Sequence, residues 1–422
     1  MTTTNQTTKK PYFYGWTVVI MLFISYSATT VSTNTLPFFF PELMKEFGWK
    51  HAQIVRPASF YFIYIAIFAP IVGFLLTKIT PKTAILTGAS LSLCCTLGFA
   101  VMQNYTHLHI IYFVFSMAIT LCGLLPSMVL ISNWFQKKRG LATGIFLVGS
   151  SVGNIIFPQL ASRLVLMYDW RMAAVGVAIV AAILSFIPLI FIKNTPEEIG
   201  QNVDGEVLVT DNSILKNVVK NTESVLTIRQ LLKSPVFYLL LFVTAAFWFC
   251  GFGVLQNLRL YLTDCGFDIR QAANISSLFS VCSIVGKISF GYMSDKFNKI
   301  NTLILATIGL ILGLFCLKIT ATSHNFAYLY AVFYGLGYSG AFAMIQLTVA
   351  DLYKGASFKK VLGLVSSFDS IGGFAGVALL GYLRTQNGNY NSAILLLMAV
   401  CGGALLLSLF LKRAATRSTT TV

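Results

Sequence analysis

Long apolar segments separated by short polar loops follow one another along the whole chain. Each segment is near or above the roughly 20 residues that a helix needs to cross the hydrocarbon core of a bilayer. Twelve segments can be delimited, at about 13–43, 57–77, 83–103, 108–133, 141–166, 172–192, 235–262, 272–293, 302–321, 326–351, 361–384 and 391–411. This pattern predicts an all-α membrane protein with twelve transmembrane helices, and the even number places both termini on one side.

The composition agrees with the lipid bilayer as the main environment of this chain. Hydrophobic residues make up 56% of it and charged residues only 10%, whereas soluble domains carry about 25% charged residues. The longest polar stretch, 194–234, is too short to form a substantial core. We therefore expect no separate soluble domain.

The basic residues set the expected orientation. With both termini inside, 20 Lys and Arg residues fall on the cytoplasmic side and 9 on the outer side, and Lys287 completes the total of 30. Short cytoplasmic loops normally carry such an excess, which explains the net charge of +16 without a nucleic-acid partner. We expect a multi-pass protein with cytoplasmic termini in the plasma membrane, or in the inner membrane if the source is a bacterium.

The chain contains an internal repeat at an offset of 218 residues. Residues 73–78 (GFLLTK) align with 291–296 (GYMSDK), and residues 46–49 (EFGW) align with 264–267 (DCGF) in the same register. Two gapless matches at one offset indicate two pseudo-symmetric six-helix halves. The predicted N-terminal half, cytoplasmic linker and C-terminal half span 1–193, 194–234 and 235–422.

One lysine, Lys287, lies inside an apolar segment. An ammonium group there is costly unless it faces a polar cavity or a partner, so an intramembrane lysine is a candidate for a functional site. Four residues later, at Gly291, the segment is expected to end in a tight polar turn that runs to Lys296.

The turn resembles the loop motif G-x-x-x-D-(R/K) of the major facilitator superfamily, which lies between the second and third helices of each half. The motif is complete in the second half, with Asp295 and Lys296, whereas Thr77 replaces the aspartate in the first half. The resemblance implies a twelve-helix secondary transporter that works by alternating access. It also implies that Asp295 and Lys296, with the nearby Arg139, form the gate at the cytoplasmic ends of the helices.

Shorter motifs are similar to those of the monocarboxylate transporter and oxalate/formate antiporter group. They are Tyr14-Gly15-Trp16, Phe47-Gly48-Trp49, F-x-K-K-R-x-L-A-x-G at 135–144, Asp169-Trp170-Arg171 and Pro196-Glu197-Glu198-Ile199-Gly200. In that group an arginine on helix eight, four residues before a glycine, binds the substrate carboxylate, and Lys287 with Gly291 matches this position. The chain departs from the group because the residue is a lysine, because Ser283 replaces an acid of the animal members, and because Asn34 replaces their first-helix lysine.

Asp369 on the eleventh segment offers a second charged group. It is nine residues from Lys360, and Lys287 is eight residues from Asp295, which places them about 13 and 12 Å from the cytoplasmic ends of their helices. At matching depth the two charges would form either a direct pair or a coupled site. Further candidates for the substrate path are Asn34, Asn154, Tyr334 and Tyr338.

These features predict a secondary transporter, a symporter or an antiporter, for a small organic anion such as a mono- or dicarboxylate. Lys287 would contact the anion, and Asp369 would be the coupling acid or the ion-pair partner that is released on binding. One alternative is a transporter of a zwitterionic or larger polar solute, such as an amino acid or a carboxylate siderophore, with Asp369 binding an amine. Another is a non-transporting membrane sensor built on the same bundle.

The sequence predicts neither an enzyme nor a bound cofactor or metal. It contains no Walker motif for ATP, and its four histidines lie in or near the expected outer loops. The expected partners are a small-molecule solute, the lipid bilayer and, as coupling ion, the proton, and we expect a monomer.

Overall fold

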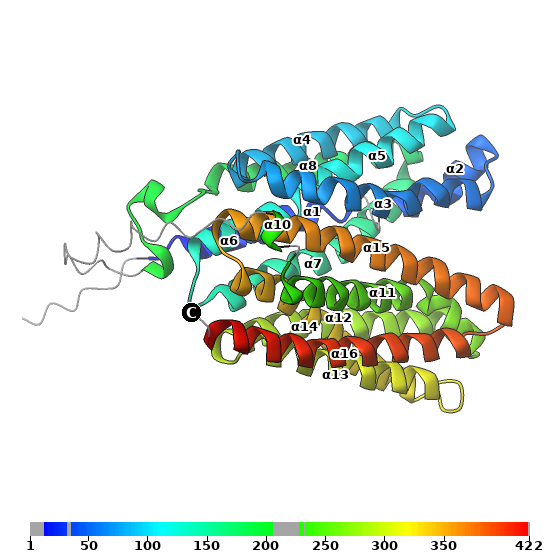
Figure 1. Cartoon of the computed structure of the whole chain (residues 1–422). Coiled ribbons are helices and arrows are strands. Elements are labelled where there is room, and N and C mark those ends of the chain that lie inside the picture. The colour runs from blue at the N-terminus through cyan, green and yellow to red at the C-terminus, as the bar shows by residue number, and fades with distance from the viewer. Residues whose placement is uncertain (1–11, 32–34, 206–227, 232, 421–422) are drawn as a thin grey trace, which may run out of the picture.

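Helices form nearly all of the computed structural model, which describes residues 12–31, 35–205, 228–231 and 233–420 (Figure 1). The described residues contain no β-strand. The elements of the first part are α1 (Gly15–Ala28), η2 (Leu36–Phe39), α2 (Phe40–Phe47), α3 (His51–Leu75), α4 (Pro81–Ala100), α5 (Tyr105–Cys122), α6 (Leu124–Trp134), α7 (Arg139–Met167), α8 (Trp170–Phe191), η3 (Pro196–Ile199) and η4 (Val203–Gly205). Those of the second part are α10 (Ile228–Leu231), α11 (Pro235–Asp264), α12 (Ile269–Lys296), α13 (Lys299–Ile319), α14 (Phe326–Leu352), α15 (Gly355–Asn387) and α16 (Asn391–Thr420).

Twelve of these helical segments account for the predicted membrane spans. Within the described residues, eleven are long and apolar enough to cross a bilayer, and the shorter apolar helix α1 is the twelfth. One of the eleven, Tyr105–Trp134, combines α5 and α6 on either side of Gly123. The all-α fold with twelve transmembrane helices is thus confirmed.

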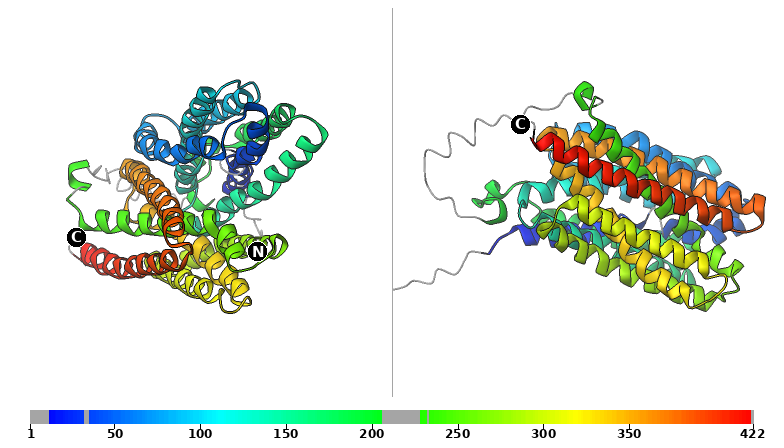
Figure 2. Two further views of the ribbon diagram at one scale, coloured as in Figure 1. Left: turned by 90° about the vertical axis from the view of Figure 1, so that its right-hand side faces the viewer. Right: turned by 60° about the horizontal axis from the view of Figure 1, so that its bottom comes forward.

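The helices form two halves that lie side by side, with α1 to α8 in one and α11 to α16 in the other (Figures 1 and 2). The halves are joined mainly by two helix pairs, because α3 packs along α15 and α7 packs along α12. Helix α1 begins and α16 ends at the same end of the bundle. We call this end, where α12 ends and α7 begins, the terminal face, and the other end the opposite face.

The first predicted span is not a single helix in the described residues. Helix α1 ends at Ala28, and a short 3-10 helix and α2 follow residues 32–34, which the structure does not describe. The hydroxyls of Ser27, Thr29 and Thr30 each donate to a backbone carbonyl three residues earlier. Such side-chain bonds compete with the helical ladder, and Pro37 cannot donate to it, so the polar run interrupts the helix.

The prediction that residues 291–296 form a polar turn is also wrong, because these residues form the last turns of the helix α12. Gly291 serves close packing here. A Cβ atom built on it would lie 2.6 Å from the carbonyl oxygen of Gly140 on α7. The motif therefore ends a helix that presses against the other half of the molecule.

The repeat is visible in the backbone at the opposite face. Gly48 follows α2 with φ of 67°, and Gly266, 218 residues later, follows α11 with φ of 88°. Glycine adopts this left-handed conformation without steric cost, so each glycine lets the chain turn away after its helix, at Gly48 as the C-cap and at Gly266 one residue beyond the C-cap. The boundaries 1–193, 194–234 and 235–422 stay a prediction, since much of the linker lies outside the described residues.

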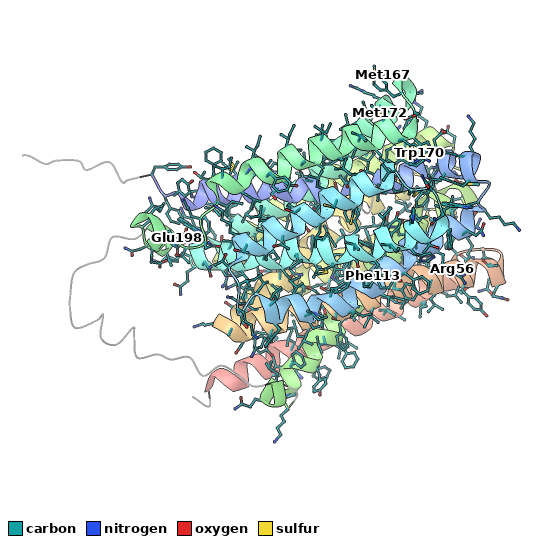
Figure 3. The ribbon with its side chains drawn as sticks, turned by 90° about the horizontal axis from the view of Figure 1, so that it is seen from above. Arg56, Phe113, Met167, Trp170, Met172 and Glu198 are labelled. Carbon is teal, nitrogen blue, oxygen red and sulfur yellow. The ribbon has the colours of Figure 1, made fainter. Side chains whose placement is uncertain are left out.

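The exterior of the bundle is apolar, as a surface in contact with lipid should be. Phe113, Met167 and Met172 are 45%, 73% and 57% exposed; Phe113 lies along α5, whereas Met167 and Met172 lie where α7 ends and α8 begins (Figure 3). Glu198 lies at the terminal face and Arg56 toward the opposite face in the same view. The protein is therefore a multi-pass membrane protein whose polar groups collect at its ends and along the junction of the halves.

Candidate functional site

Near the terminal face the backbones of α7 and α12 touch. A Cβ atom on Gly144 would lie 2.4 Å from the carbonyl oxygen of Lys287, and the contact of Gly291 with Gly140 is as tight. Small residues at these positions let helices from the two halves approach closely. Any larger side chain would force α7 and α12 apart.

Asp295, one of the predicted gate residues, caps the first turn of α7. Its Oδ1 accepts a hydrogen bond from the backbone N–H of Gly140 at 2.6 Å, and its Oδ2 accepts one from Leu141 at 2.9 Å. The free N–H groups and the dipole of a helix N-terminus favour a carboxylate. The acid of one half thus holds the helix of the other half.

The other two predicted gate residues lie beside this cap. Arg139 is 3.7 Å from Asp351 of α14, and Lys299 is 3.0 Å from the same carboxylate. Lys296 is exposed and lies over the ring of Tyr292, 4.5 Å from its centroid. Arg139 therefore takes part in a contact between the halves, whereas Lys296 contacts its own helix.

The second junction, between α3 and α15, repeats the close packing with different chemistry. A Cβ atom on Gly363 would lie 2.5 Å from the carbonyl oxygen of Ala69, next to Gly73. Thr77, which replaces the aspartate and lies just after α3, donates to the carbonyl of Phe74 near the end of that helix. The link across the halves comes from Lys359, whose Nζ donates to the carbonyl of Leu76 at 2.8 Å.

Lys287 lies on α12 at the α7 junction and is only 4% exposed. Its Nζ donates to the carbonyl oxygen of Leu147 at 3.0 Å, to Ser150 Oγ at 3.1 Å and to Ser151 Oγ at 2.7 Å. All three acceptors are neutral and belong to α7. Among the described side chains, no carboxylate lies within ion-pair distance of this ammonium group.

Asp369 is 7% exposed and lies on α15 against α11. Gly372, three residues later, packs on the backbone of Ala245, which brings α15 close to α11. Thr244 and Trp248 of α11 face the carboxyl group. In the described structure Asp369 Oδ1 and Trp248 Nε1 are both buried without a hydrogen-bond partner.

Lys287 and Asp369 are therefore not a direct ion pair in this structure, although both are buried. An aromatic pair connects their surroundings. The ring of Phe342 lies 5.9 Å from Lys287 Nζ and 5.2 Å from the ring of Trp248. Tyr338 extends the cluster, since its ring stacks on Phe247 and meets Trp248 edge-on.

The remaining predicted residues are spread over several environments. Tyr334 is fully buried, and its hydroxyl donates to the carbonyl of Cys250 at 2.9 Å, which is a packing role. Tyr338 is half-buried within the aromatic cluster, and Asn154 is exposed on α7. Asn34 lies outside the described residues.

The sequence analysis missed Ser150, Ser151, Phe342 and Trp248. Trp248 had a readable signal, because it is a tryptophan in the middle of an apolar segment and not at its end. The two serines directly follow Gly149, but nothing in the sequence says that they face Lys287. Phe342 is one of 35 phenylalanines.

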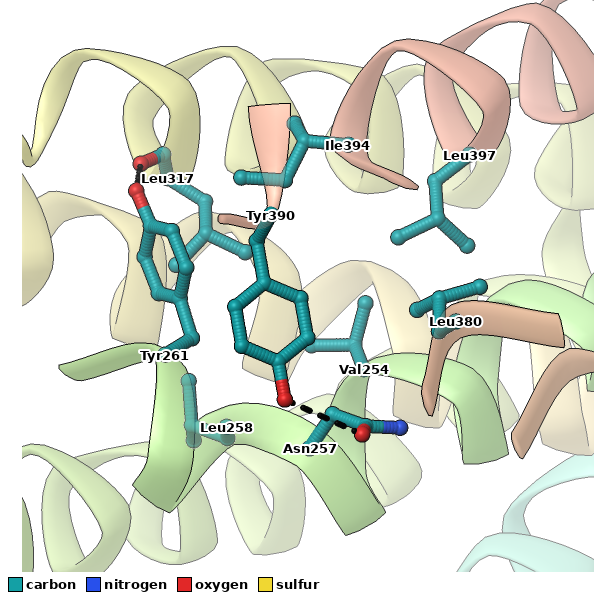
Figure 4. Close-up of a pocket in the computed structure, with 9 residues that line it drawn as sticks. All are labelled: Val254, Asn257, Leu258, Tyr261, Leu317, Leu380, Tyr390, Ile394 and Leu397. Carbon is teal, nitrogen blue, oxygen red and sulfur yellow. Dashed lines mark hydrogen bonds between the residues drawn. The ribbon is translucent and has the colours of Figure 1, made fainter. Parts of the chain in front are cut away.

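A small cavity within the C-terminal half lies apart from these groups, between α11, α13, α15 and α16, and its lining is mainly apolar (Figure 4). Its polar groups bond internally, with Tyr390 donating to Asn257 and Tyr261 to the carbonyl of Leu317, so it is best explained as a packing defect. A metal centre is not indicated either, because the described residues contain no group of three or more His, Cys, Asp or Glu that could hold a metal ion.

A bundle of twelve membrane spans in two related halves, with a buried charge at their junction, is the architecture of a membrane transporter. The family model of the Major Facilitator Superfamily matches residues 22–353 and 258–421. The chain belongs to this superfamily, whose members are transporters and not enzymes.

Relatives and solved structures agree with this assignment. Monocarboxylate transporter 13 of Rattus norvegicus is 25% identical, over 94% of this chain and 87% of its own length. The glycerol-3-phosphate transporter of Bacillus subtilis is 23% identical, over 91% of this chain and 89% of its own. The structures of the proton:xylose symporter XylE (13% identity; 95% of this chain, 96% of that one) and the human organic anion transporter MFSD10 (12%; 93% and 99%) match with TM-scores of 0.75 and 0.74. At these identities the structures show the shared fold alone.

Proposed function

We propose that this protein is a secondary transporter for a small organic anion, a mono- or dicarboxylate, with Lys287 as the contact for the anionic group. The observation that carries the proposal is the buried ammonium at the junction of the halves, which has only neutral acceptors around it. Ionisable groups within membrane spans are expensive and mark solute paths. A substrate anion would supply the opposite charge that the described residues do not.

The names of the relatives support the same substrate class. Monocarboxylates and glycerol 3-phosphate, which appear in the names of two relatives, are both small anions. Neither name fixes the substrate of this chain at 25% identity or below. The two names share an anionic headgroup, which is the feature that Lys287 can bind.

We place the protein in the plasma membrane, or the bacterial inner membrane, with both termini in the cytoplasm and a monomer as the working unit. The terminal face is then the cytoplasmic face, and the contacts of α7 with α12 and of α3 with α15 close it. Asp369, which is buried but separate from Lys287, is the candidate acid for proton coupling. Substrate exchange without a proton is the other mode of coupling that this arrangement supports.

Uptake into proteoliposomes tests the anion site. Lys287→Gln should abolish uptake of acetate, succinate or glycerol 3-phosphate, whichever the wild type transports, and Lys287→Arg should retain part of it, since arginine keeps the charge but offers a planar donor array. Lys318→Gln, which removes an exposed lysine from α13, is the matched control. Uptake by Lys287→Gln at the wild-type rate would refute the anion site.

A second candidate function is supported by the unpaired Asp369 Oδ1 beside Trp248. A buried acceptor without a partner is unfavourable, and an amine on a zwitterionic or larger polar substrate would satisfy it. In that case transport would survive the loss of charge at Lys287 and fail in Asp369→Asn. The same uptake series therefore separates the two substrate classes.

A further inference from the structure

The contact of Lys287 with α7 uses the whole donor capacity of its side chain. An ammonium group carries three hydrogens and no acceptor. Leu147 O, Ser150 Oγ and Ser151 Oγ take one each, at 3.0, 3.1 and 2.7 Å. An incoming anion can therefore hydrogen-bond to Lys287 only if at least one of these acceptors gives up its bond.

The acceptors form a preorganised group on one helix. Ser150 Oγ itself donates to the carbonyl oxygen of Leu147 at 2.8 Å, so its lone pairs remain available for the ammonium. Ser151 is 8% exposed, which keeps water from competing for the same bond. The three groups lie just beyond Gly144, whose close approach to the Lys287 carbonyl brings α7 within reach.

We call the hydrogen bonds of the Lys287 ammonium to Leu147, Ser150 and Ser151 the Lys287 clasp. It is one of three described contacts that hold α7 and α12 together along their length. From the terminal face inward they are the cap of Asp295 on Gly140, the backbone contact of Gly291 with Gly140 and Gly144, and the clasp of Lys287. Because α7 and α12 belong to different halves, all three contacts must break when the halves separate at the terminal face. The Lys287 clasp is the innermost of the three and the one that involves the proposed substrate contact.

We propose that the Lys287 clasp is a latch that an anion releases: the substrate takes the ammonium from Leu147, Ser150 and Ser151, and this weakens the closure of the terminal face. Ser150 and Ser151 are positioning residues that hold the ammonium in the empty carrier. The inference rests on the proposed anion site and deepens it, since it links occupancy of that site to the movement of the halves. The same groups thus explain why an empty carrier stays closed at this face.

The latch has a reciprocal thermodynamic consequence. If anion binding favours separation of α7 from α12, then weakening the clasp must raise the affinity for the anion. A single hydrogen bond to a charged group is worth about tenfold in an equilibrium constant, so loss of both serine hydroxyls should tighten anion binding by at least about tenfold. A purely structural clasp predicts the contrary, namely lower stability with unchanged or weaker anion binding.

The test uses the full-length protein with spin labels on cysteines introduced at Lys138 and Phe297, which are exposed beside the start of α7 and the end of α12. The exposed Cys94 is replaced by serine in all variants. The distance between the labels is measured without ligand and with acetate, succinate or glycerol 3-phosphate. Affinity for the same probes is measured by thermal stabilisation.

The latch predicts a shift to longer distances when an anion is added to the wild type. Ser150→Ala/Ser151→Ala should show the longer distances without ligand and bind the anion at least about tenfold more tightly. Ser116→Ala is the matched control, because this buried serine on α5 bonds only to a carbonyl of its own helix. Lys287→Gln should show long distances that no anion changes.

Two outcomes would separately refute the latch and count against the proposed anion site. An unchanged distance in Ser150→Ala/Ser151→Ala, or weaker anion binding by that variant, would refute the latch even if the wild type binds anions. Absence of binding of every probe to the wild type would count against the proposed anion site. In that case the ligand-free distances would still decide whether the clasp closes the terminal face.

Discussion

Asp295 on α12 accepts a hydrogen bond from the backbone N–H of Gly140 at 2.6 Å, across the junction of the two halves. A carboxylate of the second half thereby caps a helix of the first half. The equivalent position in the first half is Thr77, just after α3, which bonds back to Phe74 of that helix, while Lys359 makes the corresponding link between the halves. At the terminal face, both junctions between the halves are therefore closely packed through glycines, but a carboxylate links α12 to α7 whereas a lysine links α15 to α3.

Asp295→Asn should slow transport without weakening equilibrium binding of the substrate. The change removes a negative charge from the N-terminus of α7 and weakens two charge-assisted bonds, a loss of roughly 1–2 kcal/mol from the closed state. This corresponds to about a 5–30-fold change in the balance between open and closed forms. Counterflow rates and binding are the measurements.

Asp351→Asn is the control for this prediction. Its carboxylate lies at the same face and contacts Arg139 and Lys299, but it is half exposed, so it should contribute little. If Asp295→Asn lost equilibrium binding with an intact fold, the cap would belong to the substrate site and not to the gate.

Gly144→Ala should open the terminal face. The new methyl group would lie 2.4 Å from the backbone oxygen of Lys287, and a backbone atom cannot move aside without shifting the helix. Overpacking of this kind costs about 1–3 kcal/mol, here in the closed state alone. A longer distance between labels at Lys138 and Phe297 is the expected result.

Gly402→Ala on α16 is the matched control, because a Cβ atom there has no neighbour within 4 Å. Helical alanine is favoured over glycine by roughly 0.5–1 kcal/mol, so this variant should be neutral or slightly more stable. Equal behaviour of the two alanine variants would show that contact between α7 and α12 does not control the closure.

Lys287→Gln and Asp369→Asn should have additive effects on stability. The two side chains share no hydrogen-bond partner in the structure, and Lys287 bonds to α7 whereas Asp369 faces α11. Independent sites add within about 0.5 kcal/mol, while a direct ion pair would couple by up to about 3 kcal/mol. Thermal unfolding of the two single variants and the double variant measures the coupling.

The same variants test the role of Asp369 in proton coupling. If Asp369 carries the coupling proton, Asp369→Asn should retain exchange of substrate for substrate and lose accumulation driven by a pH gradient. Loss of both activities would mean that Asp369 is needed for binding or for the movement itself.

Acid should weaken a contact at the opposite face. Glu46 accepts hydrogen bonds from Trp170 and from Arg171, and these hold its pKa below the ordinary value near 4.5. A carboxyl group with a lowered pKa in the folded state stabilises the fold above its unfolded pKa, and this contribution is lost as the pH falls through the lower folded value. The carboxylate is partly exposed, so the contribution is no more than about 1 kcal/mol.

Glu46→Gln should therefore lower the unfolding temperature slightly at pH 7, and the difference from wild type should shrink as the pH falls below the ordinary value near 4.5 and through the lowered pKa of Glu46. Glu42→Gln on the same helix removes an equal charge without the Trp170 contact and serves as the control. A difference that grew in acid would contradict the sign of the pKa shift.

Cysteine labelling tests the proposed orientation. In a Cys94→Ser background, Glu197→Cys should react with an impermeant maleimide only from the cytoplasm, and Asn389→Cys only from outside. Both residues are exposed, at opposite ends of the bundle. Labelling of both from one side would contradict the five spans, α11 to α15, that separate the two positions.

The sequence alone determined the class of protein, the membrane spans and the register of the repeat. Hydropathy is a local property that acts against the bilayer segment by segment, so twelve apolar runs specify twelve spans without knowledge of how they pack. The alignment of residues 46–49 with 264–267 correctly placed Gly48 and Gly266 at equivalent helix ends. The position of Lys287 inside an apolar span was also enough to mark it as unusual.

Only the tertiary structure decided which groups meet. Helical periodicity gives the face of each helix on which Lys287 and Asp369 lie. Which helix packs against that face depends on contacts between residues far apart in the sequence. Close contacts at glycines 140, 144 and 291 place α7 against α12. The ammonium therefore bonds to Ser150 and Ser151, and Asp369 faces α11. The break after Ala28 escaped hydropathy for a related reason, because it depends on where serine and threonine hydroxyls find their acceptors and not on how apolar the segment is.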